Sequence, residues 1–236
     1  EITRQGLKWV YRLNAPADQY AASLIDAATG LGKPKTIAFI YENTDFGTST
    51  VKTAKEYVTK KGIQVVADEP YSKGSPDYRS TLTKVKAKNP DLVFMVSYVA
   101  DAILLMRQSR EIGLKPQAFL GGGAGFTTVQ FANEKQISNY VLSCTQWTDD
   151  VNWPGAADFA KRYKAKFGKE PTYHAACAYE AMMIMAQTAA AANGDREKTR
   201  AGLKAGKWNG IMGEVKFEDY AGFTNQNNHQ MLVQQI

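Results

Sequence analysis

Apolar residues in the first two thirds of the chain follow two recurring patterns. Short, nearly uninterrupted runs of apolar and β-branched residues predict strands that are buried on both faces of a sheet. Longer segments with apolar residues at helical spacing predict the helices between them. Residues 43–47 are predicted to form a loop, with Thr48 or Ser49 capping the next helix. The predicted strands cover residues 35–41, 63–68, 92–98, 117–120 and 140–145, and the predicted helices cover 19–29, 51–61, 78–88 and 100–112. This alternation indicates right-handed crossovers and a parallel sheet.

The pattern changes after Trp147. Helices are predicted at 156–167, 172–193 and 196–205, with hardly a strand between them. Because an apolar helix face must be buried on something, these helices either cover the first sheet or belong to a sheet that this sequence does not contain. Strands are predicted again at 213–217 and 230–236, and a strand-like run at 8–13 precedes the first helix.

Composition narrows the class of protein. Of the 236 residues, 44% are apolar, which is enough for a buried core, and no apolar run is long enough to cross a membrane. The net charge is +6, but basic and acidic residues are interleaved. Dispersed charge predicts a solvated surface, so no nucleic acid partner is expected. Cys144 and Cys177 lie in apolar surroundings and are predicted to be free thiols, and with only two histidines no metal site or other cofactor is expected.

A glycine-rich run at 121–125 directly follows a predicted strand. A dinucleotide-binding fingerprint would need a third glycine at the position of Phe126. The sequence also contains no nucleophile elbow, P-loop or HExxH motif, and His174 has no neighbouring carboxylate. We therefore predict no catalytic residue and favour a binding protein over an enzyme. In that interpretation the small residues leave room for a ligand; the alternative is a tight turn without ligand contact.

Binding residues are expected where strands end, because open α/β sheets bind ligands outside the carboxyl ends of their strands. Aromatic side chains at such positions offer a large contact area at a low entropic cost. Aromatic residues also plug sheet edges, so each position has a purely structural alternative. The candidates at strand ends are Phe46, Tyr98, Gly122, Gly123 and Trp147.

A series of short motifs occurs in a recognisable order along the whole chain. The motifs are Ile2-Thr3-Arg4-Gln5-Gly6, Lys8-Trp9-Val10-Tyr11-Arg12, Asp45-Phe46-Gly47, Asp77-Tyr78, Asn89-Pro90-Asp91, Met106-Arg107-Gln108, Gly113-Leu114-Lys115, Gly121, and Met212-Gly213-Glu214-Val215-Lys216-Phe217 with Gly222. In this order the chain resembles the leucine/isoleucine/valine-binding proteins, which are type I periplasmic binding proteins of ABC transporters. The resemblance implies a bilobed α/β fold with two doubly wound parallel sheets, lobe one being incomplete in this chain.

The resemblance also implies how the chain is divided between the lobes. Residue 1 falls about a third of the way along the family's pattern, so we expect a missing N-terminal segment of the same protein to complete lobe one. The implied division is 1–14 as the end of lobe one and a crossover, 15–146 as lobe two, 147–208 as helices of lobe one, and 209–236 as the third crossover and the final strand or strands of lobe two.

Residue roles follow from the same resemblance. Phe46 stands where the family often has a tyrosine that packs on the ligand, and Tyr98 matches a tyrosine that contacts it. Tyr173 or His174 matches an aromatic position near the ligand side chain.

The position of Gly123 departs from the family pattern, because amino acid binders tend to carry an acid there that pairs with the ligand ammonium. Asp101, or a residue of the missing segment, could replace that acid. If neither does, the ligand has no ammonium group. Aromatic or other small carboxylates therefore stand beside branched-chain and hydrophobic amino acids as expected ligands.

The function implied is the solute-binding component of an ABC importer, which closes two lobes around a small ligand and then docks on the permease subunits. Such a receptor is exported to the periplasm, although Glu1-Ile2-Thr3-Arg4 does not look like a signal peptide. The alternative is a ligand-sensing module of a receptor or regulator built on the same fold.

Overall fold

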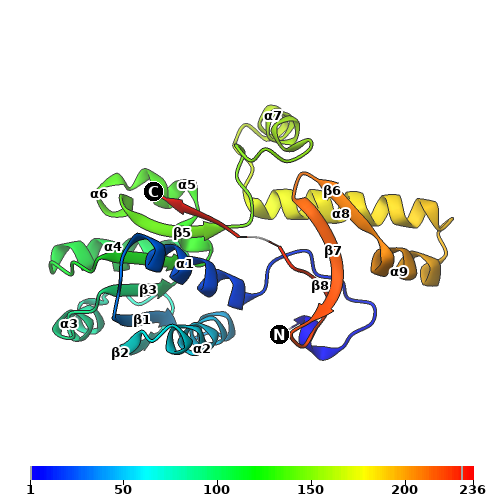
Figure 1. Ribbon diagram of the computed structural model, residues 1–236. Coiled ribbons are helices and arrows are strands. Elements are labelled where there is room, and N and C mark those ends of the chain that lie inside the picture. The colour runs from blue at the N-terminus through cyan, green and yellow to red at the C-terminus, as the bar shows by residue number, and fades with distance from the viewer. Residues whose placement is uncertain (1, 230) are drawn as a thin grey trace. The chain divides into compact units, whose positions relative to one another are not determined.

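The computed structural model describes residues 2–229 and 231–236 and divides the chain into two compact units (Figure 1). The first unit consists of Glu1–Ala15 and Gln146–Gln230, and the second consists of Pro16–Thr145 and Met231–Ile236. Each unit has its own core, and each is described separately below. Residues 1 and 230, which fall within the predicted segments 1–14 and 230–236, lie outside the described residues.

The second unit is built on a six-stranded sheet in the order β2-β1-β3-β4-β5-β9. The first five strands are parallel to one another, and β9 pairs antiparallel with β5. The bounds are β1 Thr36–Glu42, β2 Gln64–Tyr71, β3 Leu92–Val96, β4 Ala118–Gly122, β5 Val141–Thr145 and β9 Leu232–Gln235. The strands β3 and β5 are buried at every residue, and burial on both faces explains why β3 is a continuous apolar run. The predicted α/β class and parallel sheet are confirmed.

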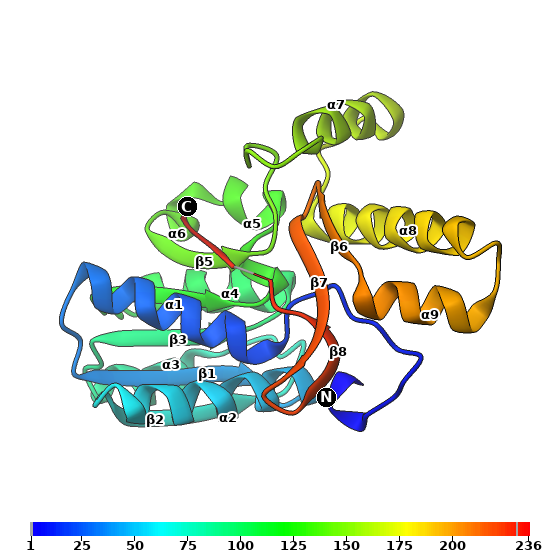
Figure 2. The ribbon, with the colours of Figure 1, turned by 45° about the vertical axis from the view of Figure 1, so that its right-hand side comes forward.

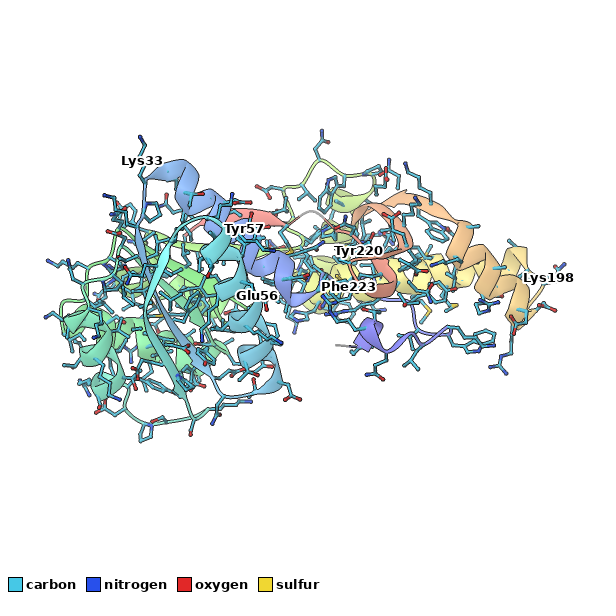
Figure 3. All side chains as sticks on the ribbon, turned by 60° about the horizontal axis from the view of Figure 1, so that its bottom comes forward. Lys33, Glu56, Tyr57, Lys198, Tyr220 and Phe223 are labelled. Atoms are coloured by element: carbon cyan, nitrogen blue, oxygen red, sulfur yellow. The ribbon has the colours of Figure 1, made fainter. Side chains whose placement is uncertain are left out.

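Helices cover both faces of this sheet (Figure 2). On one face, Ala38, Ile40, Val93 and Met95 pack in a core cluster with Leu82 and Leu105 of two helices. On the other face, the hydroxyl of Tyr57 (Figure 3) donates to Asp26 at 2.7 Å and joins the two covering helices. The helices are α1 Ala17–Leu31, α2 Asp45–Lys60, α3 Arg79–Ala87, α4 Val99–Glu111, and the short η2 Ala124–Phe126, α5 Val129–Asn133 and α6 Lys135–Ser138.

The strand order contains a topological switch point. The chain leaves β1 toward β2 on one side of the sheet, whereas it leaves β3 toward β4 on the other side. Their connections therefore diverge and leave a crevice outside the carboxyl ends of β1 and β3, where open α/β sheets bind ligands. Residues that directly follow these two strands are thus the first candidates for a binding site.

The first unit combines three helices with a three-stranded antiparallel sheet in the order β6-β7-β8. Buried Glu180 of the longest helix accepts a hydrogen bond from the amide of Ile211, in the β6–β7 turn, at 3.0 Å. Tyr220 and Phe223 flank the β7–β8 turn with ring centroids 5.6 Å apart (Figure 3). The bounds are η1 Ile2–Gln5, α7 Ala156–Phe167, α8 Tyr173–Ala191, α9 Arg196–Ala205, β6 Lys207–Gly210, β7 Gly213–Tyr220 and β8 Phe223–Asn227.

Some elements, such as β6 and β8, were not predicted from the sequence, and three predicted elements differ in the structure. Residues 8–13 do not form a strand beyond a single bridge from Arg12 to Gln226. The helix predicted from residue 51 begins at Asp45, because the side chain of Thr44 accepts from the amide of Gly47 and caps it one turn earlier than Thr48 or Ser49 would.

The third difference concerns the closing segment predicted at 209–236. Within the described residues, only the segment from 231 onward lies in the second unit, whereas β6, β7 and β8 lie in the first. The physical reason is burial: Ile211, Met212, Val215 and Phe217 pack with Ile184 of α8 in one apolar cluster. The three helices predicted between 148 and 207 therefore do share a sheet within their own unit.

None of the described helices is both long and apolar enough to cross a membrane.

Candidate functional site

The carboxyl ends of β1 and β3 bring Phe46 and Tyr98 to the same edge of the sheet. Phe46 lies in the first turn of α2, shortly after the end of β1, and Tyr98 is the residue before α4, the second residue after β3. Tyr98 is 42% exposed, and the ammonium of Lys73 lies 4.7 Å from the centroid of its ring. The edge thus presents a solvent-accessible aromatic face with a cation beside it.

Gly123 has a backbone conformation that explains why no acid stands at this position. Its φ of 125° and ψ of 171° fall in a region that is essentially restricted to glycine. A Cβ atom there would also lie 3.2 Å from Cε1 of Phe46. Any side chain at position 123, an acid included, would therefore strain the backbone and push on Phe46.

The sequence left two interpretations of the neighbouring glycines, which were room for a ligand and a tight turn. The structure favours the tight turn. A Cβ on Gly121 would lie 2.3 Å from Phe126, and one on Gly122 would lie 2.7 Å from Phe94. A Cβ on Gly125 would lie 2.3 Å from the carbonyl oxygen of Ser97. The protein's own atoms fill the room that these glycines provide, and the run serves to let β4 and its turn pack closely on β3.

Asp101, one of the two candidates to replace the acid at position 123, is 5% exposed and holds a loop in place. Both of its carboxylate oxygens accept from the amide of Gly74 at 3.2 Å, and Oδ1 also accepts from the hydroxyl of Tyr78 at 2.9 Å. Burial raises the pKa of Tyr78, and the bond to Asp101 raises it further. Asp101 therefore fixes the β2–α3 connection, which carries Lys73, rather than facing the edge.

Glu42 is a candidate that reasoning from the sequence missed. It ends β1, lies opposite Tyr71 of β2 in register, and is fully buried. Its Oε1 accepts from the hydroxyl of Thr44 at 2.8 Å. Among the residues that the structure describes, no donor reaches Oε2. The sequence signal that could have identified it is an acid that closes an otherwise apolar strand.

Three further predicted residues lie in the first unit. Trp147 is 2% exposed and packs edge-on against Phe159, so it is part of that unit's core. Tyr173 and His174 open α8 with stacked rings whose centroids are 3.9 Å apart. Tyr173 is buried and His174 is exposed, and desolvation lowers the pKa of His174.

Among the residues that the structure describes, no group of three or more His, Cys, Asp or Glu side chains could hold a metal ion. Cys144 and Cys177 are free thiols, as predicted, and burial raises the pKa of both, that of Cys177 to about 12.

The fold and the edge together define a doubly wound α/β unit with aromatic residues at its switch point. Residues 3–236 match the model of the periplasmic binding protein family, and the chain belongs to that family. The predicted resemblance to leucine/isoleucine/valine-binding proteins is confirmed by a similar curated protein, Leu/Ile/Val-binding protein homolog 8 of Brucella abortus (strain 2308). That protein is 32% identical over 184 residues, which cover 72% of this chain and 46% of the relative. This chain thus spans about half the length of the curated relatives that it matches.

Solved structures agree on the fold. The leucine-binding protein LivK from Thermotoga maritima matches with a TM-score of 0.86 and 23% identity, covering 99% of this chain and 66% of that one. A solute-binding protein of an ABC transporter from Rhodopseudomonas palustris BisB5, solved with 3,4-dihydroxybenzoic acid, matches with a TM-score of 0.79 and 17% identity, covering 98% of this chain and 64% of that one.

Proposed function

We propose that the protein is the solute-binding component of an ABC importer, which captures a small carboxylate-bearing ligand by hinge closure between two lobes. The observation that carries the proposal is the switch point of β1 and β3, where an exposed aromatic ring, a cation and a glycine-only turn meet in a member of the periplasmic binding protein family. Hinge closure requires a ligand that contacts both lobes, because a ligand held equally well in the open and closed states shifts nothing.

The second unit provides one lobe's half of the binding site in this proposal. Phe46 and Tyr98 pack on the ligand, and the backbone at Gly123 lets it approach the sheet edge. The first unit provides Tyr173 and His174 from the start of α8, with Trp147 supporting them from the core.

Further chain completes the first unit in the proposed receptor. The helix α8 exposes Met182, Met183 and Met185, which a soluble helix ordinarily buries. This chain matches only about half of each curated relative, so the unmatched half of the relative could include a segment that covers these methionines. We assign this role to an N-terminal segment of the same protein.

The ligand belongs to one of two classes. The names of the curated relatives favour leucine, isoleucine and valine, whereas the R. palustris structure contains an aromatic carboxylate. The partners are the permease subunits of the importer, the location is the periplasm, and no chemistry is carried out on the ligand. A ligand-sensing module would share the site but not the permease.

Calorimetric titration of the intact protein tests the proposal. We expect micromolar or tighter binding of at least one compound from a panel of L-leucine, L-isoleucine, L-valine, benzoate and 3,4-dihydroxybenzoate, without turnover. We also expect ligand to change the small-angle scattering profile, as closure of two lobes would. Binding with no change in shape would contradict the hinge mechanism, and conversion of the ligand to a product would identify an enzyme instead.

A further inference from the structure

The chain passes between the two units three times. These crossings fall at residues 15–16, 145–146 and 230–231. A hinge motion is absorbed by a few residues in loops or at the ends of elements, so the backbone at or near the three crossings must absorb it in this protein. The contacts that hold the crossings therefore determine how the hinge can move.

Gln146 links the second crossing to both of the others. The residue is fully buried, and its side-chain Oε1 accepts from the backbone amide of Ala15 at 2.7 Å. Its backbone carbonyl oxygen lies 2.7 Å from Nε2 of buried His229. Because a carbonyl oxygen can only accept, Nε2 carries the proton and donates. Ala15, Gln146 and His229, which we call the clasp, thus connect the three crossings within the first unit.

The first and third crossings are also joined directly to each other. The side-chain amide of Gln226 donates to the carbonyl oxygens of Asn14 at 2.8 Å and Arg12 at 3.3 Å. The side-chain amide of Asn227 donates to the carbonyl oxygen of Leu13 at 3.3 Å. Gln226 and Asn227 are buried, and breaking a hydrogen bond of a buried polar group is costly. These two segments therefore move together, and the clasp adds the second crossing to them.

Within the second unit the crossings enter regular structure almost at once. Thr145 is the last residue of β5 and lies opposite Leu232 of β9 in register. Pro16 is the N-cap of α1, and its ring fixes its φ. Only a few backbone dihedrals therefore separate the clasp from the sheet and from α1.

We propose that Gln146 is a positioning residue of the hinge, which holds the three crossings together so that closure bends all three at once between the clasp and the second unit. This inference rests on the proposed function, because it describes how the proposed closure is guided. Three crossings that bent independently would let the lobes adopt more arrangements. A ligand would then find the arrangement it binds less often, and its affinity would fall in that proportion.

Spin labels in the intact protein without ligand test the inference. The labels are attached at Lys33→Cys and Lys198→Cys, two exposed positions in different units (Figure 3), and the distribution of distances between them is measured by double electron–electron resonance. Burial raises the pKa of the native thiols, Cys144 and Cys177, so the labels react with the introduced cysteines. Gln146→Met keeps the length of the side chain and removes the acceptor for the Ala15 amide. We expect it to broaden the distribution.

A matched control separates this role from a merely structural one. Oγ1 of Thr36 accepts from the amide of Asp91 at 2.9 Å, at the amino ends of β1 and β3 and away from the crossings. Thr36→Val should lower the free energy of unfolding, as Gln146→Met should, but it should leave the distance distribution unchanged. A Gln146→Met protein that loses stability while its distribution stays as narrow as that of the wild type would overturn the inference.

A second variant breaks the clasp at its other contact. His229→Phe removes the donor to the carbonyl oxygen of Gln146 and keeps a ring beside Trp153, so we expect it to broaden the distribution as well. If Gln146→Met does not fold by circular dichroism, His229→Phe decides, and an unchanged distribution in it counts against the clasp.

Titration with L-leucine and with 3,4-dihydroxybenzoate provides an independent readout. We expect Gln146→Met to weaken binding of the compound that the wild type binds by roughly two- to tenfold, and an unchanged affinity would contradict the guiding role. A wild-type protein that binds none of the compounds in the panel above overturns the proposed function, whereas the distributions measured without ligand still decide whether Gln146 holds the crossings together.

Discussion

Replacement of Gly123 by alanine would test whether the backbone of the β4 turn requires glycine. The conformation at φ 125° and ψ 171° costs a residue with a side chain about 1–3 kcal/mol. Alanine also lowers the conformational entropy of the unfolded chain, and this effect favours the folded state by roughly 0.4–1 kcal/mol. The new Cβ would lie 3.2 Å from Phe46, close enough that the ring must move by a few tenths of an ångström. We therefore expect Gly123→Ala to lower the free energy of unfolding by about 1–2 kcal/mol.

Urea denaturation followed by far-ultraviolet circular dichroism measures this loss. All four tryptophans, at positions 9, 147, 153 and 208, lie in the first unit, so circular dichroism rather than tryptophan fluorescence reports on the second. The matched control is Gly30→Ala in the last part of α1, where nothing lies within 4 Å of the added Cβ and φ is not positive. That change should stabilise the protein by up to about 1 kcal/mol. A Gly123→Ala protein as stable as the Gly30→Ala control would refute the reasoning.

Three further predictions concern buried polar groups. Asp101→Asn replaces one of the two oxygens that accept from the amide of Gly74. We expect it to lower the free energy of unfolding by about 1–3 kcal/mol in the same urea assay. A negligible loss would show that other contacts hold the loop. Burial lowers the folded-state pKa of His229 below its ordinary value, so the unfolded chain binds the proton more readily and stability should decline as pH falls through about 6.5. His229→Gln should flatten that decline, and an unaltered pH profile would contradict the assignment. Burial raises the pKa of Cys144 and Cys177, so neither thiol should react with iodoacetamide at pH 8 until urea is added, as mass spectrometry would detect.

The sheet of the second unit could be predicted from the sequence because its strands are buried on both faces. Continuous apolar runs such as 92–96 have no polar alternation that competes with this interpretation, and the helices between them carry clear end signals. The strand β8 of the first unit gives no such signal, since its sequence Phe-Thr-Asn-Gln-Asn is polar. Its stability comes from distant partners: the side chain of Gln226 is buried and donates to the carbonyl oxygens of Arg12 and Asn14. Such pairing across more than 200 residues cannot be read from local propensity.

The candidate site was predictable in position but only partly in chemistry. Phe46 and Tyr98 follow strands and reach the switch point, as expected of residues at carboxyl ends of parallel strands. Trp147 satisfies the same sequence rule, yet it lies in the core of the first unit, because a large aromatic residue at a strand end can equally turn inward to pack. The role of Asp101 depends on Gly74 and Tyr78, which are 27 and 23 residues away along the chain, and no local pattern connects them.

The absence of an acid at position 123 carries less weight for the ligand than the sequence alone suggests. The backbone conformation at position 123 requires glycine. The glycine therefore gives no information on whether the ligand has an ammonium group. A binding protein with this turn would place any carboxylate for the ligand at another position. The carboxylate oxygens of Asp101 already accept from the amide of Gly74 and the hydroxyl of Tyr78 in its own unit, so their lone pairs are engaged in holding the β2–α3 connection rather than a ligand.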